Sequence, residues 1–377
     1  MKRVGIITMH RVLNYGSVLQ AFATQQIVRG LGFDAMLIDY KFPNQYHYDR
    51  ETDERRKIKP WYKKTAKQNL INLVIKTKRL LGIGNQSIKI KRFKNFINDN
   101  YKLTEPYDTF ERLNTMPPDF DIYMTGSDQV WNHKTSKGDP NFFLDFVRNG
   151  APRIAFSASF TMIPDEASAR YLKEYTHISM RENNGREICS RLTDRDIPLT
   201  LDPTLMLSAD EWKRIAQAKQ EDNGCIVLYM LDYAYGTNPY MYDIAKFWQK
   251  KIGTKIVSIG VCQSGTGLDI EKRDDSGPME FIQIMYNARL VITNSFHGTA
   301  FALNFGKPLI AVAPPNDEDD RIATIITSTR TNNCLVKTGY AIDEIDPHYD
   351  VEAEQTTLDG LRRTSFDYLR NALNATK

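Results

Sequence analysis

The chain has 377 residues and a formal net charge of +4, with 50 Lys and Arg against 46 Asp and Glu. This length predicts two domains, and 41% hydrophobic with 25% charged residues excludes a disordered or collagen-like protein. The four cysteines stand alone without the spacing of a zinc site, so we expect no disulfide framework, no metal and a reducing, cytoplasmic environment. No apolar run reaches the roughly 20 residues that span a bilayer.

The chain opens with alternating strand and helix patterns. Residues 4–9 form an apolar run typical of a buried strand, 15–31 carry apolar residues on one helical face, and 33–40 predict a second strand. After a long insertion, we expect strands at 121–125, 153–157, 177–180 and 198–201, with helices near 165–175 and 184–192.

The insertion concentrates the positive charge of the chain. Residues 50–94 hold 15 Lys and Arg against 3 Asp and Glu, a net of +12, which leaves the rest of the chain at −8. Leucine and isoleucine recur at helical spacing over 70–81, with Trp61 and Tyr62 ahead of them, which is typical of a helix on an anionic membrane surface. The alternative is a helical insertion that packs on its own domain. Nucleic acid is not an expected partner, because the aromatic residues are not interleaved with the basic ones.

A second series of strands and helices begins near residue 225. Strands are expected at 225–231, 255–259, 290–293 and 308–312, with helices at 240–251, 278–287, 298–305, 320–327 and 358–373. Two such series in tandem predict two Rossmann-like domains, each a doubly wound parallel sheet, facing each other across a cleft. We expect an N-terminal domain over 1–205 with the basic helical insertion at about 41–118, a C-terminal domain over 206–350, and a C-terminal helix over 351–377 that packs back across both.

In such folds, ligands bind beyond the carboxyl ends of the strands, so the loops there hold the candidate site residues. After the first strand, Asn14 and Ser17 are candidate helix caps, and the helix N-terminus offers free N–H groups to an anion. No glycine-rich nucleotide fingerprint occurs in the chain, so no dinucleotide cofactor is expected, although Asp39 stands where a ribose-binding acid would.

A polar segment, residues 126–132, follows the strand at 121–125. Its Asp128, Gln129 and Trp131 suit sugar binding, because polar groups bond to hydroxyls while an indole stacks on a ring face. The alternative is a capped helix start, with Asp128 as the cap and Trp131 in the core.

Two further strand ends carry charged candidates. Arg181 comes directly after the strand at 177–180 and has the planar geometry that binds a carboxylate or phosphate, with a surface ion pair to Glu182 as the alternative. His297 stands in the segment 293–302, where a polar run ends a strand and a small-residue helix begins. A histidine at a helix N-terminus can donate a proton near neutral pH or bind a phosphate.

Several of these segments together resemble one known family. They are Asn14-Tyr15-Gly16-Ser17, Gly126 to Asn132, Met180-Arg181-Glu182, Leu201 to Thr204, Gly277-Pro278, and Asn294 to Phe301 followed by Gly306-Lys307-Pro308. From residue 4 to about 312, the chain is similar to the polysaccharide pyruvyl transferases. The resemblance implies a fold similar to the two-domain GT-B glycosyltransferase architecture. It also implies a reaction that moves the enolpyruvyl unit of phosphoenolpyruvate onto two hydroxyls of a sugar, forming a cyclic ketal and releasing phosphate.

The resemblance also implies roles for the candidate residues. His297 is the expected acid or phosphate-stabilising group, Asp128 the base or acceptor-orienting group, and Arg181 a contact to the negatively charged phosphoenolpyruvate. Substrate-binding residues are expected in the same segments: Asn14, Gly16, Ser17, Ser127, Gln129, Trp131, Asn294, Ser295, Gly298 and Thr299. In better-studied members an Arg-Leu pair precedes the histidine. Here the pair is Ser295-Phe296, so the cation that would contact the donor is missing at this position. Either another basic residue replaces it, with Arg11 and Arg321 as the candidates, or the enzyme uses a different donor.

The expected partners are therefore phosphoenolpyruvate and a sugar or lipid-linked glycan, in the synthesis of a capsule, an exopolysaccharide or another cell-surface glycan. Residues 50–94 would bring such an enzyme to the inner face of the membrane. Two alternatives stay open, because a fold does not fix a function. One is a GT-B glycosyltransferase that uses a nucleotide sugar, and the other is a glycan-binding protein with reduced catalysis.

Overall fold

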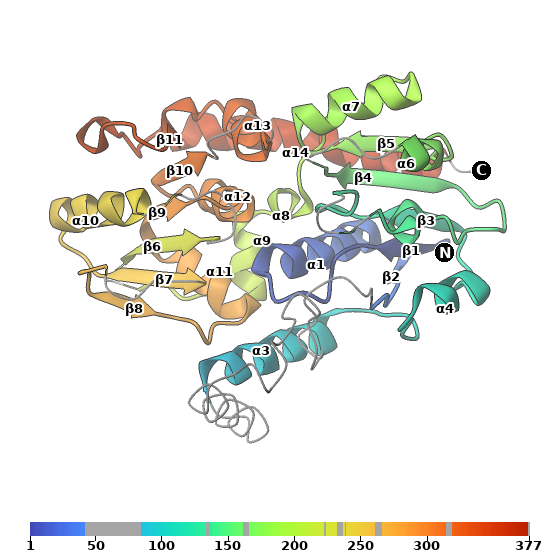
Figure 1. The fold of residues 1–377 in the computed structure, drawn as a ribbon, viewed down its shortest axis with the longest axis horizontal. Helices are drawn as coiled ribbons and strands as arrows, with labels where there is room; N and C mark the ends of the chain where they lie inside the picture. The colour runs from blue at the N-terminus through green and yellow to red at the C-terminus, as the bar shows by residue number, and fades with distance from the viewer. Residues whose placement is uncertain are drawn as a thin grey trace, which may run out of the picture.

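The computed structural model describes residues 1–41, 84–132, 136, 138–160, 166–221, 224–231, 237, 239–260, 266–313 and 319–375. Two β-sheets lie side by side, each flanked by helices (Figure 1). The first has the strand order β2-β1-β3-β4-β5 and the second β11-β10-β9-β6-β7-β8, and all neighbouring strands are parallel. The first order is that of flavodoxin-like sheets, and the second is that of Rossmann sheets. The predicted fold class is confirmed.

The strands of both sheets are short and apolar. Those of the first sheet are β1 (Arg3–Ile7), β2 (Asp34–Leu37), β3 (Ile122–Thr125), β4 (Arg153–Ala158) and β5 (His177–Met180). Those of the second are β6 (Cys225–Met230), β7 (Ile256–Gly260), β8 (Ile270–Lys272), β9 (Ala288–Thr293), β10 (Leu309–Ala313) and β11 (Leu335–Lys337). Central strands such as β6 and β10 are buried along their whole length, because helices cover both faces of a parallel sheet.

The helices connect the strands. In the first half they are α1 (Tyr15–Gly30), α3 (Asn85–Asn100), α4 (Phe110–Thr115), α6 (Glu166–Leu172), α7 (Asn183–Thr193) and α8 (Pro203–Met206). In the second half they are α9 (Ala209–Ile215), α10 (Tyr240–Ile252), α11 (Pro278–Tyr286), α12 (Phe296–Asn304), α13 (Arg321–Ser328) and α14 (Val351–Asn374). The cap predicted at Asn14 is confirmed, since its side chain accepts the Ser17 N–H at the start of α1.

Two sequence predictions of elements need correction. Residues 198–201 form no strand, because only Leu199 bridges to β5 and the Leu201 N–H bonds instead to the Ser365 hydroxyl of α14. The last helix begins at Val351, where the expected C-terminal segment 351–377 starts, and not at 358 as the apolar periodicity indicated, because the Asp350 side chain accepts the N–H of Ala353 and caps it there.

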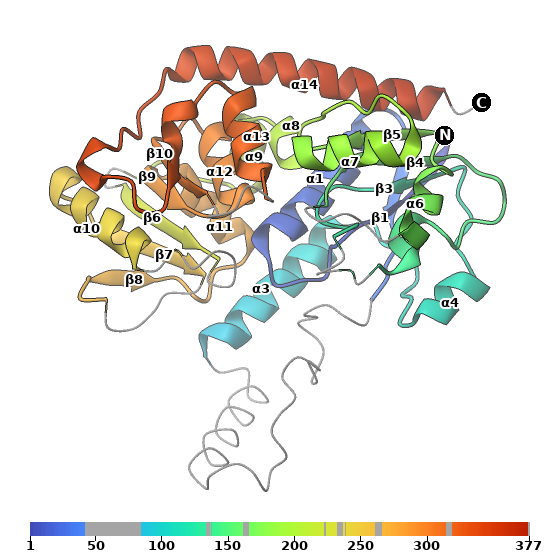
Figure 2. The ribbon, with the colours of Figure 1, turned by 45° about the horizontal axis from the view of Figure 1, so that its top comes forward.

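α14 runs along both sheets (Figure 2). Near its start, the Gln355 amide donates to the Leu303 carbonyl of α12 at 2.9 Å. Near its end, the Tyr368 ring stacks on Phe156 of β4, with ring centroids 6.4 Å apart. One helix therefore ties the two halves of the molecule together.

α3, from the basic insertion, makes a second bridge. It packs between α1 and α11, and the Arg92 guanidinium lies 2.8 Å from Asp275 Oδ2 and 3.0 Å from Glu280 Oε1 of the second half. Beside it, the Tyr15 ring of α1 stacks on Phe281 of α11 at 4.8 Å, so the two halves share a continuous apolar core. Residues 50–83 of the basic block lie outside the described residues. Within the described ranges, no helix has both the length and the hydropathy needed to cross a membrane.

Candidate active site

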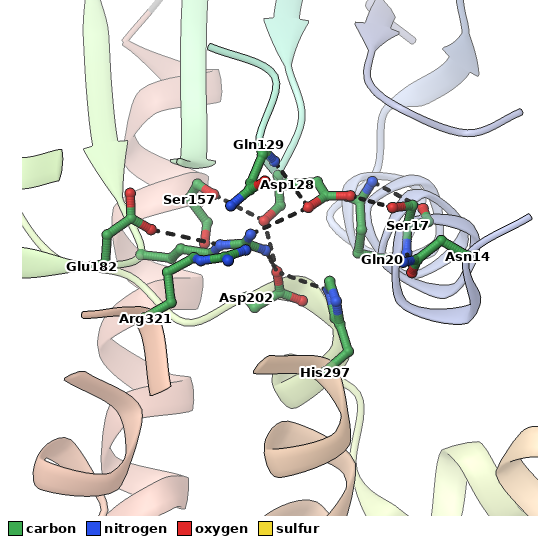
Figure 3. Close-up of polar contacts among 12 residues, drawn as sticks. Asn14, Ser17, Gln20, Asp128, Gln129, Ser157, Glu182, Asp202, His297 and Arg321 are labelled. Carbon is green, nitrogen blue, oxygen red and sulfur yellow. Dashed lines mark hydrogen bonds and ion pairs between the residues drawn. The ribbon is translucent and has the colours of Figure 1, made fainter. Parts of the chain in front are cut away.

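Polar side chains from both halves meet where β3 and β5 end and α12 begins. In Figure 3, His297 points toward Asp202, and Ser17 at the start of α1 reaches Asp128. Three candidates that are far apart in the sequence, Asp128, Arg181 and His297, are thus brought into one cluster. The carboxyl ends of parallel strands are where such folds bind ligands.

Arg181 lies at the centre of this cluster. Its guanidinium nitrogens lie 3.2 Å from Asp128 Oδ1, 2.7 Å from Asp202 Oδ2 and 3.6 Å from Glu182 Oε2. The ring of Phe296 covers the guanidinium at 4.5 Å. Because the Arg181 side chain is 1% exposed, its charge is compensated inside the cluster, and removing it would leave buried carboxylates unpaired.

Asp128 is held in an unusual backbone conformation. Its φ is 78°, in the left-handed region that Asp tolerates better than most residues. One carboxylate oxygen accepts the Gln129 N–H at 2.9 Å, and the other accepts the Ser17 hydroxyl. Burial alone would raise the pKa of Asp128, but the charges of Arg181 and His297 and these hydrogen bonds outweigh it, so the pKa lies below its ordinary value. Asp128 is therefore a carboxylate at neutral pH.

Glu182 is a member of the cluster that the sequence analysis treated only as an ion-pair partner. Its side chain is fully buried, and Oε1 accepts the N–H of Phe160 at 2.9 Å. Burial raises the pKa of Glu182 to about 8, although the charges of Arg181 and Arg321 act in the opposite direction. A buried acid thus contacts the same guanidinium that pairs with the carboxylates of Asp128 and Asp202.

His297 lies in the first turn of α12, as the sequence predicted. The helix begins there because the Ser295 hydroxyl accepts the Gly298 N–H at 3.3 Å. The imidazole Nε2 lies 3.7 Å from Asp202 Oδ2, and the other edge of the ring packs against Gly16 of α1. The residue is 6% exposed, so the ring is fixed between the two halves of the molecule.

Asp202 is the second residue that the sequence analysis left out of the site. It precedes Pro203 at the start of α8, and its side chain accepts the Thr204 N–H as a helix cap. That Asp-Pro pattern was visible in the sequence, but it signals a helix start rather than a partner for a distant histidine.

Other predicted substrate-binding residues support the scaffold in this structure. Ser127 donates its hydroxyl to Asp202 at 2.8 Å, and the Asn294 side-chain oxygen accepts the Leu231 N–H at 2.8 Å. The Thr299 hydroxyl donates to a carbonyl of its own helix. Contacts between these residues and a substrate stay predictions.

The sugar-stacking role predicted for Trp131 is contradicted by its position. Its indole is 1% exposed, stacks on Phe143 with ring centroids 5.4 Å apart, and donates its N–H to the Phe142 carbonyl at 3.0 Å. Trp131 is a core residue because the backbone turn at 128 directs the following segment into an aromatic cluster.

The two candidate cations proposed for the missing arginine lie in different places. Arg11 forms a bidentate pair with Asp39, beside β2. Arg321, at the start of α13, donates to Asp319, and the side-chain amide of Gln129 lies within hydrogen-bond distance of the same guanidinium. Of the two, Arg321 is therefore the one that lies at the cluster, with its side chain 16% exposed. Within the described part of the chain, no group of three potential ligand residues is placed to hold a metal ion.

The comparison with protein families decides the classification. A family model described as polysaccharide pyruvyl transferase matches residues 14–316, most of the chain. The chain belongs to the polysaccharide pyruvyl transferase family. Its membership of this family makes it a transferase of polysaccharide biosynthesis. No curated protein sequence matches the chain closely enough to count as a relative.

Solved structures agree with the fold of this pyruvyl transferase. A UDP-N-acetylglucosamine 2-epimerase from Rickettsia bellii matches with a TM-score of 0.51 and 10% identity, covering 98% of each chain. A putative enzyme of the same name from Listeria monocytogenes matches with a TM-score of 0.50 and 11% identity, covering 98% of this chain and 90% of that one. At these identities the likeness concerns the fold alone, which is the two-domain GT-B architecture.

Proposed function

We propose that this pyruvyl transferase uses phosphoenolpyruvate as its donor and two hydroxyls of a glycan as its acceptor, and that the product is a pyruvate ketal. The observation that carries the proposal is the convergence of His297, Asp128 and Arg181 at the junction of the two sheets. Transfer between a small charged donor and a glycan needs a proton donor, a group that orients hydroxyls and charged side chains in one enclosed place.

In this reaction two sugar hydroxyls become bonded, one after the other, to the same carbon of phosphoenolpyruvate. A proton adds to the methylene carbon of phosphoenolpyruvate, and the first sugar hydroxyl adds to the neighbouring carbon as its own proton is taken up by a base. The second hydroxyl then displaces phosphate from that carbon and closes the ketal, and its proton leaves with the phosphate or a base. One acid and one base satisfy this balance, and the base can also orient the acceptor hydroxyl.

In this proposal, His297 supplies the acid or stabilises the leaving phosphate from the first turn of α12, where a helix N-terminus favours an anion. Asp128, held ionised, accepts a hydrogen bond from an acceptor hydroxyl. Arg181 holds Asp128 and Asp202 in place, since its guanidinium is enclosed by carboxylates. Arg321 meets the donor charge, roughly −3 for a carboxylate with a phosphate of about −2, because its side chain is partly exposed beside the cluster.

The test is a transfer assay with the purified chain. We expect phosphate release from phosphoenolpyruvate only when a suitable glycan is present, with a matching increase in the glycan mass. His297→Ala should reduce this release by about 10²-fold or more, whereas the control Asp139→Asn, at a carboxylate that accepts the Tyr40 hydroxyl away from the cluster, should retain it.

Three other outcomes would contradict the proposal. Near-normal release by His297→Ala would remove the central role of His297. Transfer from a nucleotide sugar but not from phosphoenolpyruvate would indicate a glycosyltransferase. Glycan binding without turnover of any donor would indicate a glycan-binding protein.

A further inference from the structure

Asp202 is a buried carboxylate whose orientation is fixed from several sides. Its Oδ1 accepts both the Thr204 N–H at 3.0 Å and the Thr204 hydroxyl at 2.8 Å. Its Oδ2 accepts the Ser127 hydroxyl at 2.8 Å and an Arg181 N–H at 2.7 Å. With both oxygens engaged and the side chain without exposure, Asp202 has a single orientation, and the ring of His297 lies 3.7 Å from Oδ2.

The imidazole of His297 is fixed from the opposite side as well. A β-carbon at Gly16 would lie 2.0 Å from Nδ1, so the α1 backbone packs tightly against that edge of the ring. The nitrogen that faces the Asp202 carboxylate is Nε2, which is buried and has no hydrogen-bond partner within the described residues. A carboxylate in this position can accept only an Nε2–H, so it selects the tautomer and the ring orientation.

The local charges favour a second cation beside Asp202. Asp128 and Asp202 are both carboxylates, and both face the single guanidinium of Arg181. The pKa of Glu182, raised to about 8, keeps that acid mostly protonated at neutral pH, and Arg321 is paired with Asp319. This arrangement therefore leaves one excess negative charge in a buried place, where charges interact more strongly than in water. His297, whose Nε2 lies 3.7 Å from Asp202 Oδ2, can supply a compensating positive charge as an imidazolium.

We propose that Asp202 is the positioning residue of His297, holding the imidazole in one tautomer and stabilising its protonated form for proton donation. The inference rests on the proposed function only in giving His297 a proton to donate. Asp202 comes from the first half of the chain and His297 from the second, so the pair exists only while the two halves are packed together. The acid of the reaction is thereby assembled across the junction of the sheets.

The first experiment needs no substrate. The chain is labelled at the histidine ring carbons, and the signal of His297, one of 6 histidines, is identified as the one lost in His297→Gln. We expect Asp202→Asn to lower the pH at which this signal titrates by about 1 to 3 pH units, the effect of removing an opposite charge at this distance. The control Asp139→Asn should leave the titration unchanged, since Asp139 contacts Tyr40 instead.

The second experiment measures turnover of phosphoenolpyruvate with a glycan. Asp202→Asn should lower kcat by about 10²-fold. Because His297 acts while protonated, kcat falls at high pH, and this fall should begin at a lower pH in Asp202→Asn, in step with the His297 signal. Asp202→Glu keeps the charge but displaces it, so its kcat should fall while the titration of His297 stays near that of the unaltered chain. If Asp202→Asn does not fold, the kcat of Asp202→Glu decides the test.

The outcomes distinguish a failure of the positioning role of Asp202 from a failure of the proposed function. An unchanged His297 titration in a folded Asp202→Asn chain would overturn the positioning role, whatever the turnover. If only Asp202→Glu folds, a near-normal kcat in that variant would do the same, because a displaced carboxylate would then serve as well as the original one. A shifted titration in a chain that turns over no phosphoenolpyruvate would leave the pair standing and overturn the proposed function instead.

Discussion

The imidazole of His297 packs directly on the backbone of Gly16, so that a β-carbon at position 16 would lie 2.0 Å from His297 Nδ1. Gly16 belongs to the first turn of α1 and His297 to the first turn of α12. The contact therefore joins the two halves of the enzyme at the candidate catalytic histidine. It is so close that only a glycine fits, although the backbone of Gly16 is ordinarily helical.

Gly16→Ala should disrupt the contact between the His297 imidazole and the backbone of α1. The added methyl group must displace either the imidazole or α1, and overpacking of this kind costs about 1–3 kcal/mol of unfolding free energy. We expect a lower denaturant midpoint and a large loss of turnover, measured on the same preparation. Gly30→Ala is the matched control on the same helix. Nothing lies within 4 Å of a β-carbon there, so its stability should be unchanged or higher by up to about 1 kcal/mol. Equal effects of the two substitutions would show that the contact at Gly16 has no special role.

Trp131→Phe should affect stability rather than acceptor binding. The substitution removes the hydrogen bond from the indole to the Phe142 carbonyl and leaves a space in the aromatic cluster. We expect a loss of about 1–3 kcal/mol in unfolding free energy, with an unchanged KM for the glycan. A raised KM in a chain of unchanged stability would restore the sugar-stacking role that the sequence suggested.

Glu182 should make the enzyme less stable as the pH rises. Its pKa in the folded chain is about 8, above the ordinary value of 4.5, so the folded state binds the proton more tightly than the unfolded state. The contribution of this group is therefore full below about pH 4.5 and is lost as the pH rises through about 8. Glu182→Gln should flatten the decline in unfolding free energy measured over roughly pH 5 to 9.

The control for this measurement is Glu352→Gln, at an exposed position in the first turn of α14. It should leave the slope as it is. Part of the decline should persist in Glu182→Gln, because burial also raises the pKa of Glu354 to about 7. A slope identical to that of the unaltered chain would mean that Glu182 stays ionised inside the cluster.

Residues 50–94 predict binding to anionic membranes, since they carry a net charge of +12. We expect the chain to sediment with vesicles that contain phosphatidylserine, and not with neutral ones, in a manner that weakens as salt is raised. Deleting residues 61–81 should abolish the binding. If the shortened chain binds the vesicles as before, the prediction of membrane binding by this segment is wrong. The alternative, an insertion that packs on its own domain, would then be favoured.

Much of the fold could be predicted from the sequence. The strand at 177–180 and the helix over 15–31 follow from the local spacing of apolar residues, which depends only on residues near one another in the sequence. The prediction failed at 198–201, where an apolar segment bonds to Ser365 of α14, more than 160 residues later. A local pattern cannot indicate such a distant partner.

The sequence by itself also determined which loops hold the site and that His297 begins a helix, because strand ends and caps are local features. Only the tertiary structure decided that Trp131 belongs to the core, that Gly16 receives the histidine ring, and that Asp202 faces it. The physical reason is that burial and charge pairing are set by which segments meet. Two halves with separate origins in the chain pack together here, and the candidate acid lies where their helices α1 and α12 meet.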